Sequence, residues 1–130
     1  MIDFSKKEVG NFGEKYCAKH LKKLGFKILS RNSRLGHLET DIVATNKEVV
    51  CFVEVKTRRI DKNNIGRPAE AVDHKKRTNL LKFAYYYVKT LPKKHSSKQI
   101  RMDVCEIFVN ASNKRLEVCD LNYIENAFSR

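Results

Sequence analysis

Two acidic residues and one lysine have the types and spacing that can support metal-dependent chemistry. Asp41 stands directly before an apolar run, residues 42–44, and Glu54 and Lys56 lie within a second apolar run, residues 49–56. Successive side chains of a β-strand point to opposite faces, so Glu54 and Lys56 share one face. Carboxylates are ligands that Mg²⁺ prefers, and a lysine beside them can orient or deprotonate a water molecule.

A hairpin would bring these three residues together. Residues 45–48 are polar and have the composition of a turn. If this turn is centred near Lys47 and Glu48, Asp41 lies opposite Glu54, and both carboxylates are within reach of one cation. An acidic pair beside a lysine on valine-rich strands indicates a metal-dependent nuclease site. The alternative is a surface ion pair that protects an edge strand from aggregation.

The residues before the hairpin predict a helix and a short strand. Apolar residues follow 3.6-residue spacing over residues 5–24, and Gly25 is a natural helix stop. We expect a strand at residues 26–30 and a polar loop at 31–36, leading into the hairpin of residues 38–56.

The residues after the hairpin predict a second helix and two further strands. Residues 57–67 are polar and basic and predict a loop, and Pro68 suits the first turn of a helix that ends before Pro92. The remaining predicted elements are a basic loop at 93–98, a strand beginning near residue 100, a turn at 110–113, a strand at 116–119 and a helical turn within 121–128.

This order of elements predicts an α/β fold. A long helix between the hairpin and the next strand permits a crossover, which gives a mixed β-sheet flanked by helices. Neither a repeat nor a linker divides the sequence, so residues 1–130 are expected to form a single domain.

The charge of the chain indicates an anionic partner. Lys and Arg number 27 against 15 Asp and Glu, a formal net charge of +12. Residues 67–101 alone hold ten basic residues and two acidic ones, a local net charge of +8. Such a surplus attracts nucleic acid, although an anionic membrane surface would serve electrostatically as well. No apolar stretch is long enough to span a membrane and no signal-peptide core is present, so we expect a cytoplasmic protein without a membrane partner.

The cysteines and the tyrosine run favour packing roles. Cys17, Cys51, Cys105 and Cys119 form no C-x-x-C pair, which favours free cysteines that fill a core. The run Tyr85–Tyr87 lies at helical positions that face different ways, so at least one ring is expected in the core.

The sequence resembles the YraN-like family of small bacterial proteins, which are described as predicted nucleases related to Holliday junction resolvases. This family is placed in the PD-(D/E)xK restriction-endonuclease-like superfamily. The resemblance rests on seven motifs in order: Gly10-x-x-Gly13-Glu14, Arg31-Asn32-x-Arg34, Glu39-x-Asp41-Ile42-Val43-Ala44, Phe52-Val53-Glu54-Val55-Lys56-Thr57-Arg58, Ala71-Val72-x-x-Lys75, Arg101-Met102-Asp103-Val104 and Ile124-Glu125-Asn126-Ala127-Phe128.

The resemblance implies a restriction-endonuclease-like fold and a set of site residues. Asp41 and Glu54 would bind the metal directly, with the carbonyl of Val55 as a third ligand. Lys56 would act on the attacking water, and Glu14 is the family's helix-borne acid.

Further residues would serve the site from its edges. Glu39 could hold a second cation or support the first. Phosphate contacts are expected from six basic residues: Arg34, Arg58, Arg59, Lys75, Lys76 and Arg77.

We therefore expect an endonuclease that uses Mg²⁺ or Mn²⁺ to hydrolyse phosphodiester bonds in DNA, with branched or structured DNA as one candidate substrate. A homodimer would suit the cleavage of two symmetry-related strands. Two alternatives stay open: a non-catalytic nucleic-acid-binding module of the same fold, and a scaffold for a protein partner. The sequence does not separate DNA from RNA.

Overall fold

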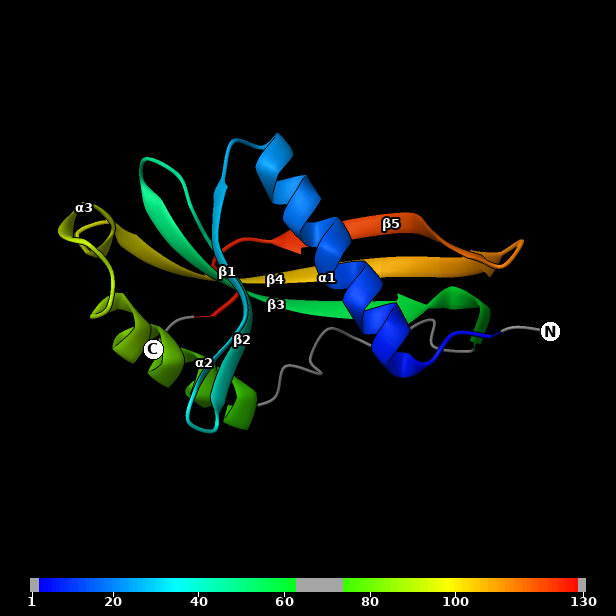
Figure 1. Cartoon of the computed structure of the whole chain (residues 1–130), viewed down its shortest axis with the longest axis horizontal. Coiled ribbons are helices and arrows are strands. Elements are labelled where there is room, and N and C mark those ends of the chain that lie inside the picture. The colour runs from blue at the N-terminus through cyan, green and yellow to red at the C-terminus, as the bar shows by residue number, and fades with distance from the viewer. Residues whose placement is uncertain (1–2, 63–73, 129–130) are drawn as a thin grey trace.

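The computed structural model describes residues 3–62 and 74–128 (Figure 1). Its elements in chain order are α1 (Lys6–Lys23), β1 (Lys27–Leu35), β2 (Leu38–Thr45), β3 (Val49–Arg59), the 3₁₀ turn η1 (Ile60–Lys62), α2 (His74–Val88), α3 (Lys93–Ser96), β4 (Gln99–Ser112) and β5 (Arg115–Ile124).

The strands form one mixed sheet in the order β1-β2-β3-β4-β5. The pairs β1–β2, β2–β3 and β4–β5 are antiparallel, and β3–β4 is parallel, with α2 in the crossover. The sheet twists strongly, so that β1 and β2 run steeply across the direction of β4 and β5 in Figure 1. The predicted α/β class, a mixed sheet flanked by helices, is confirmed.

The first helix has clear signals at both ends. Ser5 caps its N-terminus in a capping box with Glu8: each side chain accepts a hydrogen bond from the other's backbone N–H. At the other end Gly25 adopts a positive φ of 93°, which glycine tolerates without steric cost. These signals explain why the prediction for residues 5–24 is confirmed almost to the residue.

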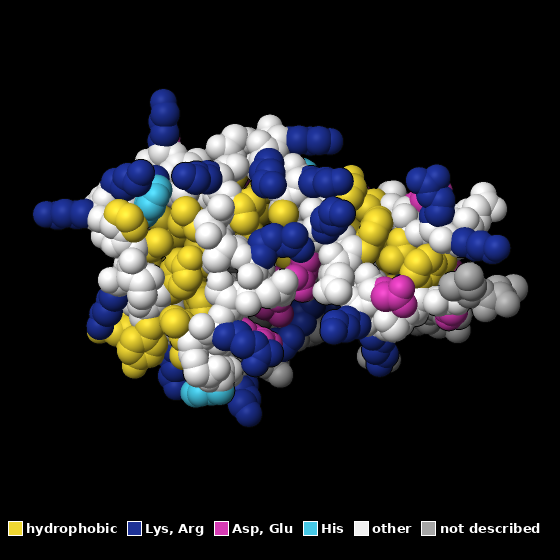
Figure 2. Space-filling model, viewed as in Figure 1, with side chains coloured by type: hydrophobic (Ala, Val, Ile, Leu, Met, Phe, Trp, Pro, Cys, Tyr) yellow, Lys and Arg dark blue, Asp and Glu magenta, His cyan; other side chains and the backbone are white. Residues whose placement is uncertain are grey.

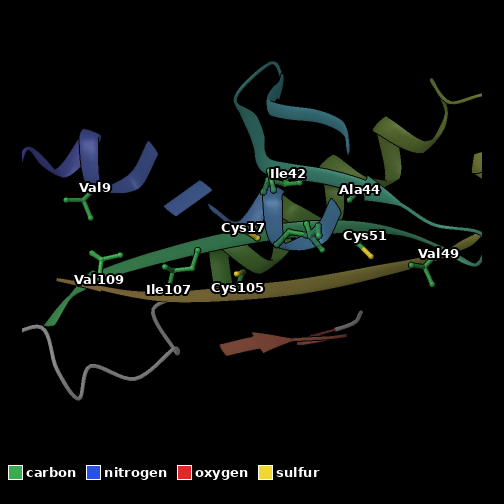
Figure 3. Close-up of a cluster of buried hydrophobic side chains, with 12 residues drawn as sticks. Val9, Cys17, Ile42, Ala44, Val49, Cys51, Cys105, Ile107 and Val109 are labelled. Atoms are coloured by element: carbon green, nitrogen blue, oxygen red, sulfur yellow. The ribbon is translucent and has the colours of Figure 1, made fainter. Parts of the chain in front are cut away.

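The two helices cover opposite faces of the sheet and create two cores. On the α1 face, Cys17 and Leu21 pack on Cys51 and Cys105 among other buried residues (Figure 3). On the α2 face, Phe83 packs on the strands with its helix neighbours Leu80 and Ala84. The core role predicted for the cysteines holds for Cys17, Cys51 and Cys105, while Cys119 is exposed.

The loop predicted at residues 31–36 is wrong. β1 continues through this segment, because its backbone pairs with β2 from Arg31↔Ile42 to Leu35↔Leu38. Asn32 adopts a positive φ of 51° within the strand, and Gly36 with a φ of 63° begins the tight connection to β2. The polar side chains suggest a loop, but they lie on a strand that has solvent beside it.

The C-terminal prediction is also wrong in part. β4 runs on through the predicted turn to Ser112, and β5 pairs with it from Ser112↔Arg115 to Val104↔Ile124. Residues 121–124 are therefore strand, because a long β4 offers them a partner, and no helix forms there. Residues 93–96 make a short helix in place of a loop, and β3 continues to Arg59.

The predicted start of the second helix, with Pro68 and Val72, lies outside the described residues. None of the helices within residues 3–62 and 74–128 has the length and apolar character needed to cross a lipid bilayer.

Candidate active site

The register of the β2–β3 hairpin places Asp41 beside Glu54, as predicted. The ladder pairs Ile42 with Val53 and Thr45 with Val50, and the next positions in this register are Asp41 and Glu54. Asp41 also accepts a hydrogen bond at Oδ2 from the backbone N–H of Val55, at 2.8 Å. One carboxylate from each strand therefore lies at the same point of the sheet.

Two lysines contact the Glu54 carboxylate. Its Oε1 lies 3.6 Å from Nζ of Lys56 and 3.3 Å from Nζ of Lys76, which comes from the first turn of α2. The side chains of Glu54 and Lys56 are each only 17% exposed, whereas Lys76 is half exposed. A carboxylate and an amine of the site are thus largely shielded from water, with a second lysine at their edge.

This shielding changes the proton affinity of two groups. Burial, followed by repulsion from Glu54, raises the pKa of Asp41 to about 7. Burial and the hydrogen bond from Lys76 lower the pKa of Lys56, because a second ammonium beside it disfavours its own charge. The contact with Lys56 in turn raises the pKa of Lys76. The two neighbouring amines thus shift each other's pKa in opposite directions, down for Lys56 and up for Lys76.

Glu14 approaches the same site from α1. Its neighbour Gly13 is buried against Thr57 of β3, so closely that a Cβ at this position would overlap the Thr57 side chain. Burial, with repulsion from Glu54 as a smaller cause, raises the pKa of Glu14, and Asn32 donates a hydrogen bond to its carboxyl. Among the residues the structure describes, Glu14 Oε1 is buried without a hydrogen-bond partner. A third acid with an unpartnered oxygen thus lies close enough to repel both carboxylates.

Asp41 and Glu54 could hold a divalent cation only if water molecules supplied the remaining ligands. Within residues 3–62 and 74–128, no group of three or more His, Cys, Asp or Glu side chains is already gathered to hold a metal ion. Mg²⁺ is commonly held by one or two carboxylates while it keeps several waters, and Asp41 with Glu54 meets that requirement. The mutual repulsion that raises the Asp41 pKa is what a cation would relieve. Val55 as a carbonyl ligand stays a prediction.

The remaining predicted residues are divided between the surface and the interior. Glu39 is exposed and forms an ion pair with Arg34, 3.1 Å apart. The support of a cation by Glu39 and the phosphate contact of Arg34 stay predictions. Arg59 is nearly buried and bound by Asp3 and Asp61, each at 2.6 Å. Arg59 thus has two acidic partners within the protein, and its phosphate contact stays a prediction.

The other basic residues lie near the site. Lys75 and Arg77 are exposed on the first turn of α2, around Lys76, and Arg58 is half-buried on β3. Figure 2 shows Lys and Arg side chains spread over the visible face, with a small group of acidic side chains recessed near its middle.

Two site residues have roles that the sequence does not reveal. Lys76 is predicted to contact phosphate, yet it contacts Glu54. Glu106 has no predicted role, although the parallel β3–β4 register pairs it with Lys56 and buries its side chain, which accepts a hydrogen bond from Asn122. The alternation of β4 could have placed Glu106 on a sheet face, but the register that sets it beside Lys56 depends on the crossover.

The fold and the site define an α/β protein that carries a paired carboxylate and a shielded lysine at the centre of a mixed sheet. Residues 13–107 match the uncharacterised protein family UPF0102, and the chain belongs to this family. Similar relatives include UPF0102 proteins from Caldicellulosiruptor saccharolyticus (42% identical, covering 95% of this chain and 99% of the relative), Clostridium acetobutylicum (41%, 94% of each chain) and Dictyoglomus thermophilum (42%, 94% and 98%).

Proposed function

We propose that this protein is a Mg²⁺-dependent endonuclease of the PD-(D/E)xK type that hydrolyses phosphodiester bonds in DNA. The observation that carries the proposal is the convergence of Asp41, Glu54 and Lys56, with a raised pKa on one carboxyl and a lowered pKa on the amine. Paired groups whose environments shift their pKa values are typical of catalytic sites.

Asp41 and Glu54 would hold the cation, with Glu14 as a nearby third acid. A bound divalent cation neutralises charge on a phosphoryl group and lowers the pKa of water. The hydrogen bond from the Val55 N–H fixes one oxygen of Asp41, which orients the carboxylate toward the site.

Lys56 would take the proton from the attacking water at Nζ. A neutral amine is required for this step, and the positive charge of Lys76 together with burial favours that form. After it has gained a proton, Lys56 would stabilise the negative charge that develops on the phosphate.

Nucleic acid as the substrate is supported by charge. The formal net charge of +12 attracts polyanions, and Lys75 and Arg77 flank the lysine that contacts Glu54. Contacts from such residues to phosphate position a strand without reading its sequence.

The test is a cleavage assay on labelled duplex, single-strand, flap and four-way-junction DNA, with Mg²⁺ or Mn²⁺. We expect Asp41→Ala to abolish cleavage and Lys56→Met to lower the rate by about 10²- to 10⁴-fold. Lys114→Met, in the exposed β4–β5 turn, is the matched lysine control and should cut normally. Equal cutting by wild type and Asp41→Ala would refute the proposal.

A non-catalytic nucleic-acid-binding module is the second candidate. It is favoured by the absence of a gathered three-ligand group among the described residues and by the same positive charge. This candidate predicts DNA binding that weakens with salt, is insensitive to EDTA and is followed by no cleavage.

A further inference from the structure

A groove runs along the exposed side of α2, beside the candidate active site. Its volume is about 930 Å³, near the upper end of the range for small-ligand pockets. α2 lines it from Thr78 to Val88, and Leu38 of β2, the start of β4 and Phe128 line it as well. The lining residue Met102 pairs with Phe52, which precedes Glu54 by two residues, so the groove and the candidate site lie on the same face of the sheet.

Two tyrosines of this groove are exposed although their rings are large and partly apolar. Tyr85 and Tyr86 are 55% and 53% exposed, and their ring centroids lie 5.3 Å apart in an edge-to-face arrangement. The third tyrosine of the run, Tyr87, packs on Phe52 and Phe83. One ring of the run thus supports the core, as predicted from the sequence, and two are presented at the groove.

The charges at the groove are positive. Nζ of Lys89 lies 4.1 Å from the Tyr85 ring centroid, and Lys82 also lines the groove. The Arg77 guanidinium lies over the ring of Phe128, a lining residue of the groove, 5.6 Å from its centroid. The lining residues within the described part of the chain include neither Asp nor Glu. Figure 2 shows hydrophobic side chains exposed in this region, with Lys and Arg around them.

We infer that this groove binds an unpaired stretch of DNA, with bases stacked on Tyr85 and Tyr86 and phosphates held by Lys82 and Lys89. Aromatic platforms in a positively charged groove are the usual means of binding single strands. From Thr78 to Val88 the helix rises about 15 Å, which corresponds to about four stacked nucleotides at roughly 3.4 Å each. The inference rests on the proposed nuclease function and gives its substrate class: DNA with a single-stranded end, flap or frayed junction.

Charge favours DNA over a second copy of the chain as the occupant of the groove. Two copies that met through the groove would bring Lys82, Lys89 and Arg77 of each close to one another, on chains that each carry +12. Like charges brought together in this way are destabilising, whereas a phosphate backbone neutralises them.

The test measures the binding of labelled oligothymidylate and of a hairpin duplex in EDTA, where metal-dependent cleavage is absent. We expect the double variant Tyr85→Ala/Tyr86→Ala to lose about tenfold or more in single-strand affinity, with less than about twofold change for duplex. Tyr85→Phe/Tyr86→Phe keeps the rings and should bind normally. Tyr16→Ala, an exposed tyrosine of α1, is the matched control and should also bind normally.

The lysines give an independent measurement. Lys82→Met/Lys89→Met should reduce the slope of log affinity against log salt by about 0.7 for each phosphate of a single strand that the variant no longer neutralises, while the tyrosine variants leave the slope unchanged. Unchanged single-strand affinity in the alanine pair would overturn the inference. So would a wild-type dimer that dissociates in that pair while DNA affinity stays the same, or tyrosine-dependent binding of oligouridylate alone.

The two proposals can fail separately. Tyrosine-dependent single-strand binding without any cleavage would support the groove and refute the nuclease. Cleavage that depends on Asp41, with single-strand affinity unaffected by the tyrosines, would refute the groove alone.

Discussion

Asp41 and Asp103 lie on the same sheet but in opposite environments. Asp103 is fully buried on β4 and is surrounded by donors: Arg101 binds both of its oxygens, the Tyr123 hydroxyl donates at 2.7 Å and the Asn126 N–H at 2.9 Å. Asp41 accepts one backbone hydrogen bond and is repelled by Glu54.

This difference separates a structural carboxylate from a candidate catalytic one. A buried charge that is fully hydrogen-bonded anchors its surroundings, and here Asp103 ties β5 and residue 126 to β4. A carboxylate left with a like-charged neighbour is held at a cost, which a bound cation can remove. The chain itself supplies the hydrogen-bond donors of Asp103, whereas Asp41 keeps a like-charged neighbour.

The largest expected effect concerns Asp103, the carboxylate with the larger number of hydrogen-bond donors. Asp103→Asn should lower the free energy of unfolding by about 3–5 kcal/mol, because Arg101 loses its buried partner and keeps only the exposed Glu125. Urea denaturation measures this change. Asp120→Asn, an exposed aspartate on β5, is the matched control and should change little. A decrease below about 1 kcal/mol for Asp103→Asn would contradict a structural role for this cluster.

A smaller effect of the opposite sign is expected for Asp41→Asn without metal. The pKa of Asp41 is raised from 3.8 to about 7 on folding, so its favourable contribution exists below the unfolded pKa and is lost as the pH rises through about 7. Asparagine keeps the acceptor for Val55 and removes the charge. We therefore expect the variant to be more stable than wild type at about pH 8, by on the order of 2 kcal/mol once solvent screening is allowed for, and equal near pH 4.

Denaturation curves at the two pH values measure this difference. Asp120→Asn should show no such pH dependence relative to wild type. If Asp41→Asn were destabilised at both pH values, Asp41 would belong with Asp103 as a structural carboxylate.

The smallest expected effect is the stabilisation of wild type by Mg²⁺. At a free concentration ten times the Kd, binding to the folded state alone adds about 1.4 kcal/mol. Thermal unfolding at about pH 8 should show this gain in wild type but not in Asp41→Asn, and the gain should shrink below about pH 7 as protons compete for Asp41. An equal gain in both proteins would place the cation elsewhere.

The sequence predicts the arrangement of the site well because that arrangement is local. The turn of residues 45–48 and the alternation of the flanking strands determine that Asp41 meets Glu54 and that Lys56 shares the face of Glu54. Both facts depend on fewer than about twenty consecutive residues and on strand geometry alone. The helix α1 is predictable for the same reason, from its cap and its apolar spacing.

The sequence-based predictions that fail concern residues whose environment depends on partners distant in the chain. Polar residues 31–35 become strand only because β2 pairs with them, and residues 121–124 only because β4 is long. Lys76 and Glu106 reach the site through the crossover, and Arg59 finds Asp3 from the far end of the chain. No local sequence pattern reveals contacts between residues so far apart in the chain, so the sequence alone indicates only generic roles for these residues.

The single parallel pair in the sheet, β3–β4, has a consequence for folding kinetics. The antiparallel pairs join strands connected by short turns, whereas a long segment that includes α2 separates β3 from β4 along the chain. Contacts that close long loops form late, because their entropy cost precedes their gain. The hairpin that pairs Asp41 with Glu54 can therefore form before Lys76, which lowers the pKa of Lys56, reaches the site on α2. The complete environment of Lys56 therefore depends on the parallel pairing of β3 with β4, not on the hairpin alone.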